Sequence, residues 1–128
     1  MSSPRTGGPL PPSLAVGLGL RPGRPVGDIL ATLAAALPDV RIACLATIDR
    51  RAEEPGLRRA AAVLKVPLYG FPADRLADIR VPNPSDQVTA ALGIPGVAEA
   101  AALLAGTGPL LLPRRVVSGM VIAAAAAS

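Results

Sequence analysis

Residues 40–57, VRIACLATIDRRAEEPGL, decide the fold class of this chain. The first nine of them, Val40 to Ile48, are mostly apolar, in a continuous rather than an alternating pattern, which is typical of a strand covered on both faces. A charged stretch follows, and a helix is expected from Leu57 to Leu64, with Pro55 near its first turn. In open α/β sheets, ligands bind where loops leave the carboxyl ends of strands. The charged loop is therefore the leading site candidate.

Apolar runs and helical patterns alternate on both sides of this segment. The sequence predicts strands at 14–18, 40–48 and 66–71, and helices at 26–37, 57–64, 73–79, 85–92 and 97–104. Two last strands, 110–112 and 116–124, are expected to form a hairpin about residues 113–119. This alternation of strands and helices favours right-handed βαβ units. We expect an α/β fold: a three-layer α/β/α sandwich with a mixed, mainly parallel sheet of about five strands.

Length and composition indicate one domain, residues 13–128, behind a disordered leader, residues 1–12, that is rich in Ser, Gly and Pro. No apolar run approaches the roughly 20 residues that cross a bilayer, and no signal peptide is evident. We expect a cytoplasmic protein that does not bind membranes.

The charge pattern points to a small anionic ligand. The net charge is +4 and the arginines are dispersed. Only two aromatic side chains, Tyr69 and Phe71, are present to stack bases, so we do not expect nucleic-acid binding. Scattered arginines in loops suit a small polyanion better.

Histidine is absent from the sequence, which removes the common general base and most zinc sites. We therefore predict no metal and no cofactor. The single cysteine, Cys44, lies inside an apolar run and is best interpreted as a core residue. Any hydrolysis would have to use a carboxylate such as Glu53, Glu54, Asp49 or Glu99. Asp49 and Glu53 are the leading candidates for this catalytic role.

A glycine cluster follows the first predicted strand. Gly17 and Gly19 begin a pattern that resembles a dinucleotide fingerprint, but the third glycine falls at Gly23 and Pro22 occupies the place where it is needed. A tight turn whose amides and Arg21 face a ligand is the better interpretation, and plain turn geometry is equally open. If the first two strands are parallel, this loop and the charged loop open on the same edge of the sheet. The ligand-binding candidates at this edge are Gly17, Gly19, Arg21, Thr47, Asp49, Arg51 and Glu54.

Three further candidates each have a structural alternative. Ser85 could present helix amides to an anion or simply cap its helix. Glu99, in an alanine-rich helix, could accept loop amides or serve as a site carboxylate. Arg114 could bind an acidic ligand or mark the edge of a hairpin.

Taken together, these segments resemble the CobE/CbiG C-terminal domain family of cobalamin biosynthesis. The resemblance covers about residues 14–124 and rests on five motifs in order: Gly17 to Gly23, Thr47 to Leu57, Pro84-Ser85 with Val88, Val97 to Leu103, and Pro113-Arg114. Arg51 stands where the family pattern has lysine, and Glu53 where it has aspartate.

The resemblance implies a protein that binds or processes a precorrin, a macrocycle fringed with carboxylates. Longer members of the family open the lactone of cobalt-precorrin-5A and release acetaldehyde, whereas this chain is similar to the stand-alone members. Three roles follow as expectations. The first is precorrin binding, in which Arg21, Arg51 and Arg114 pair with carboxylates of the ligand. The second is lactone hydrolysis, and the third is non-catalytic docking on another enzyme of the pathway.

Overall fold

The computed structural model describes residues 13–38, 40–79 and 97–127. The strands in these ranges are β1 (Ser13–Gly19), β2 (Arg41–Ile48), β3 (Leu68–Phe71), β4 (Leu110–Val117) and β5 (Met120–Ala126). They form one sheet in the order β3-β2-β1-β5-β4. The pairings of β1 with β2 and of β2 with β3 are parallel, and those of β5 with β1 and β4 are antiparallel. The expected mixed sheet of five strands is confirmed.

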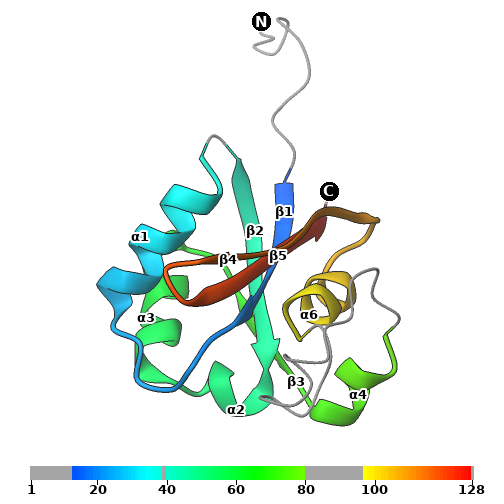
Figure 1. Cartoon of the computed structure of the whole chain (residues 1–128), viewed down its shortest axis with the longest axis horizontal. Coiled ribbons are helices and arrows are strands. Elements are labelled where there is room, and N and C mark those ends of the chain that lie inside the picture. Colours follow the sequence, from blue (N-terminus) through cyan, green and yellow to red (C-terminus); the bar gives the residue numbers. More distant parts are fainter. Residues whose placement is uncertain (1–12, 39, 80–96, 128) are drawn as a thin grey trace, which may run out of the picture.

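The described helices are α1 (Val26–Ala36), α2 (Asp49–Ala52), α3 (Pro55–Leu64), α4 (Ala73–Ala77) and α6 (Val97–Ala105). Figure 1 shows α1 and α3 on one side of the sheet and α4 and α6 on the other. The buried side chains follow the same division, because one core cluster joins β1, β2 and β5 to α1 and α3, and a second joins β2 to α4 and α6. The three-layer arrangement is therefore confirmed.

Small residues allow α6 to pack closely on the middle of the sheet. Gly17 of β1 lies beneath the helix, where an added Cβ would fall 1.8 Å from the carbonyl oxygen of Ala98. Its partner on β5 is Ala123, which is also fully buried. Gly17, a ligand-binding candidate from the sequence, thus serves close helix-to-sheet packing.

The hairpin boundaries expected from the sequence are wrong. β4 continues through Pro113 to Val117, with register shifts between Leu110 and Leu112 and between Leu112 and Arg115. An edge strand tolerates proline, because a missing N–H is harmless where no neighbour needs it. The turn is instead the pair Ser118-Gly119, with φ of 51° and 78°. Two positive φ values in a two-residue loop match the twist of the flanking strands.

Other boundaries shift by less. β3 begins at Leu68 rather than Val66, and the charged loop contains the short helix α2. The predicted leader, residues 1–12, and the predicted helix at 85–92, with Ser85, lie outside the described residues.

Candidate functional site

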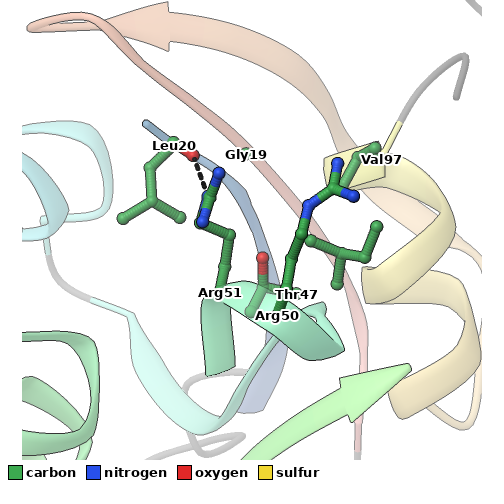
Figure 2. A pocket seen from close by; sticks show the side chains of 7 residues that line it. Gly19, Leu20, Thr47, Arg50, Arg51 and Val97 are labelled. Carbon is green, nitrogen blue, oxygen red and sulfur yellow. Dashed lines mark hydrogen bonds between the residues drawn. The ribbon is translucent and has the colours of Figure 1, made fainter. Parts of the chain in front are cut away.

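A pocket opens where the parallel strands β1 and β2 end (Figure 2). Its lining residues come from the end of β1 and the residue after it, the end of β2, helix α2 and the start of α6: Gly19, Leu20, Thr47, Ile48, Arg50, Arg51 and Val97. Arg51 Nε donates to the carbonyl oxygen of Leu20 at 3.2 Å, so the residues that follow the two strands are in direct contact. The two loops lie at one edge of the sheet, as the sequence analysis expected.

The size of the pocket limits what it can hold. The enclosed part measures about 20 Å³, and the whole hollow with its open mouth measures about 290 Å³. A space of about 10–15 Å³ on the first measure holds one water molecule. The pocket therefore accommodates a single small polar group, such as a carboxylate, while a larger ligand would lie outside it.

Thr47 ties the two central strands together at the base of the pocket. Its side chain is fully buried, and Oγ1 donates to the carbonyl oxygen of Leu18 at 2.7 Å. Since the hydroxyl proton is used in this bond, the oxygen remains available only as an acceptor. Thr47 is therefore suited to hold the strands in register and to accept a bond from water or from a protonated group.

Arg51 and Glu54 hold the connection between β1 and α1 in place. Glu54 Oε1 accepts the backbone N–H of Gly23 at 2.9 Å, and Glu54 Oε2 lies 3.5 Å from Nη1 of Arg51. Arg51 in turn donates to Leu20. Both side chains are about one-fifth exposed, at 22% for Arg51 and 21% for Glu54. We call Arg51, Glu54 and their two backbone partners the loop clasp.

Arg50 differs from its neighbour in having no hydrogen-bond or ion-pair partner among the residues that the structure describes. Figure 2 shows its guanidinium extended toward Val97, while Arg51 turns toward Leu20. Successive helical residues point in different directions, so only one of two adjacent arginines can serve the loop clasp. The sequence pattern predicts Arg51 as a site residue, but not Arg50. The adjacency of the two arginines was the signal that could have identified it.

The two catalytic candidates lie outside the pocket. Asp49 and Glu53 are both exposed, and neither belongs to the pocket lining. Asp49 packs its backbone against β3, where a Cβ added to Gly70 would fall 3.0 Å from the Asp49 Cα. Arg21 is exposed in the connection after β1 and is also absent from the lining. Among the described residues, the lining therefore contains two arginines and no acid.

Glu99 and Arg114 form a separate contact between α6 and β4. The backbone N–H of Arg114 donates to Glu99 Oε2 at 3.1 Å, and Glu99 is fully buried. Glu99 thus accepts a backbone amide of strand β4 rather than of a loop. Arg114 lies on the edge strand β4, which β5 separates from β1, and it does not line the pocket.

Across residues 13–38, 40–79 and 97–127, no group of three or more acidic or cysteine side chains is placed to hold a metal ion. No helix in these ranges combines the length and the apolar character needed to span a membrane.

Comparisons with known proteins agree on one family. Residues 14–125 match the family described as "Cobalamin synthesis G C-terminus". The chain is 37% identical over 121 residues to Protein CobE from Sinorhizobium sp, covering 88% of this chain and 79% of that protein.

Solved structures show the same likeness. The crystal structure of CobE, a protein from the cobalamin (vitamin B12) biosynthetic pathway, matches with a TM-score of 0.78 and 33% identity, over 94% of both chains. The cobalamin biosynthesis protein chiG from Agrobacterium tumefaciens matches with a TM-score of 0.69 and 32% identity, over 90% of this chain and 98% of that one. Because the family match spans nearly the whole chain, and relatives above 30% identity cover most of it, this protein belongs to the CobE/CbiG family of cobalamin biosynthesis proteins.

Proposed function

We propose that this protein binds a precorrin or a related corrinoid intermediate by inserting one peripheral carboxylate of the macrocycle into the pocket at the ends of β1 and β2. The observation that carries the proposal is Arg50, an exposed cation that lines a pocket large enough for one carboxylate and has no partner among the described residues. Charge-assisted hydrogen bonds between guanidinium and carboxylate groups are among the strongest that proteins form.

Two further features support an anionic occupant. The first is the absence of acidic side chains from the described lining: Arg51 is paired with Glu54 outside it, and no acid of the lining compensates the positive charge of Arg50. The second is Val97, the first residue of α6, which places the amino end of a nine-residue helix at the pocket. The helix dipole favours negative charge at this end.

The geometry supports binding better than lactone hydrolysis. A general base must come within hydrogen-bond reach of the water that it activates. Asp49 and Glu53 are exposed to solvent and lie outside the pocket lining, so neither is held beside the carboxylate that the pocket would bind. Hydrolysis, docking on a second pathway enzyme and a cytoplasmic location stay predictions of the sequence.

A titration with cobyrinic acid, a stable corrin that carries free acetic and propionic acid side chains, tests the proposal. Its absorbance is followed as wild-type protein, Arg50→Gln or Arg58→Gln is added. Arg58 is an exposed residue of α3 outside the pocket lining, so its variant loses the same charge without changing the pocket.

We expect Arg50→Gln to weaken binding by about tenfold, the equivalent of about 1.4 kcal/mol for a charge-assisted hydrogen bond. Arg58→Gln should stay within about twofold of wild type, because solvent and salt screen a distant surface charge. Equal weakening by the two variants, or no binding by the wild-type protein, would contradict the proposal.

A further inference from the structure

The only two aromatic side chains in the sequence stack on each other. Tyr69 and Phe71 lie on β3, with ring centroids 6.5 Å apart and planes inclined by 30°. Residues two apart on a strand share one face of the sheet, which explains how the rings meet. The pair is not simply core packing, because Tyr69 is 45% exposed.

This pair lies next to the pocket. Phe71 is the ladder partner of Ile48, the last residue of β2, and Ile48 lines the pocket. Phe71 also packs on the core cluster that contains Ile48 and Val97, both of them lining residues. The two rings therefore stand on the α4 and α6 side of the sheet, with Phe71 at the edge that carries the pocket and Tyr69 two residues further back along β3, opposite Ala46.

The opposite face of β3 is occupied, so the strand presents its rings in one direction. A Cβ on Gly70 would fall 2.8 Å from the Ala52 Cβ, which shows that α2 covers that face. Edge strands usually carry charged side chains that prevent pairing with other chains. β3 instead has the sequence LYGF, with an exposed aromatic ring and no charge.

We propose that the exposed ring of Tyr69, supported by Phe71, is the second contact area of this binding site and packs against the apolar face of the macrocycle whose carboxylate binds beside Arg50. The inference rests on the proposed function and extends it from one carboxylate to the ring system. An aromatic side chain offers a large, rigid apolar surface that can pack against apolar parts of a ligand. The described pocket holds only one polar group of the ligand, so the macrocycle has to contact the surface outside it.

The test compares four proteins in the cobyrinic acid titration: wild type, Tyr69→Ala, Tyr69→Phe and Val63→Ala. Val63 is the matched control, an exposed apolar residue (57%) on α3, across the sheet from the ring pair. We expect Tyr69→Ala to weaken binding about five- to tenfold, within the range measured for loss of an aromatic stacking contact. Tyr69→Phe keeps the ring and should stay within about twofold of wild type, as should Val63→Ala.

Each other outcome contradicts a specific statement. If Arg50→Gln weakens binding but Tyr69→Ala does not, the aromatic contact is wrong and the carboxylate site stands. If Tyr69→Ala changes the elution volume in size-exclusion chromatography while affinity is unchanged, the ring pair serves contact between protein copies instead. If wild-type protein does not bind cobyrinic acid at all, the proposed function itself fails.

Discussion

Replacing Gly17 by alanine should destabilise the protein severely. The new Cβ would lie 1.8 Å from the carbonyl oxygen of Ala98 and 2.7 Å from the backbone N of Ala102, where ordinary contacts begin at 3.4 Å. Both close atoms belong to the backbone of α6, so no side chain can turn away and the helix has to move. Overpacking of this kind typically costs about 1–3 kcal/mol, and we expect at least the upper value here because the displaced layer is backbone.

Urea denaturation followed by circular dichroism measures the free energy of unfolding. Gly27→Ala is the matched control, because no heavy atom lies within 4 Å of its added Cβ and the residue is helical. That variant should be neutral or more stable by about 0.5 kcal/mol. A Gly17→Ala protein within about 0.5 kcal/mol of wild type, but unable to bind a corrinoid, would refute the packing role and indicate a ligand contact instead.

Three further changes test the loop clasp, a helix end and the buried thiol. Glu54→Ala should lower the free energy of unfolding by about 1 kcal/mol, since Gly23 and Arg51 both lose a partly exposed partner. Glu54→Gln should recover part of this loss. Equal urea curves for wild type and both variants would contradict the prediction. Lys65→Gly should raise the melting temperature, because Lys65 has a left-handed φ of 61° at the end of α3. Glycine removes the steric cost of that conformation, about 1 kcal/mol. A lower melting temperature would contradict the prediction. Burial raises the pKa of the Cys44 thiol above its ordinary 9.0. The unfolded chain therefore loses this proton first as the pH rises, so stability above about pH 9 should fall more steeply in wild type than in Cys44→Ala; parallel pH profiles of the two proteins would contradict it.

The central part of the fold was predictable because its signals are local. β2 is a continuous apolar run and ends within the expected segment, and the parallel arrangement of β1 and β2 follows from the helix between them. The position of the two loops at one edge of the sheet was predictable from this parallel arrangement, since the carboxyl ends of parallel strands lie at the same edge. The hairpin was less predictable. Pro113 favours the end of a strand, because proline lacks the N–H that a ladder needs. The position of β4 at the sheet edge, which depends on the whole topology, removes that cost.

The candidate site was predicted as a region but not residue by residue. The sequence indicates that charges gather after β2. It does not show that Arg51 bonds to Glu54 and Leu20 while Arg50 has no partner among the described residues. Nor does it show that Gly17 faces α6, because that depends on which side of the sheet the helix covers. Side-chain direction and partner choice are consequences of tertiary packing, and a linear pattern of charges contains neither.

The location of the ligand tests the account most directly. Backbone amide chemical shifts of ¹⁵N-labelled protein, recorded as cobyrinic acid is added, report which residues change environment. We predict that the largest changes occur at the pocket edge, at Gly19, Thr47, Arg50 and Val97. A second hollow lies at the starts of α1 and α3 and is lined by Pro25, Val26, Pro55, Gly56 and Arg59. Changes confined to that hollow would contradict a corrinoid site at the ends of β1 and β2.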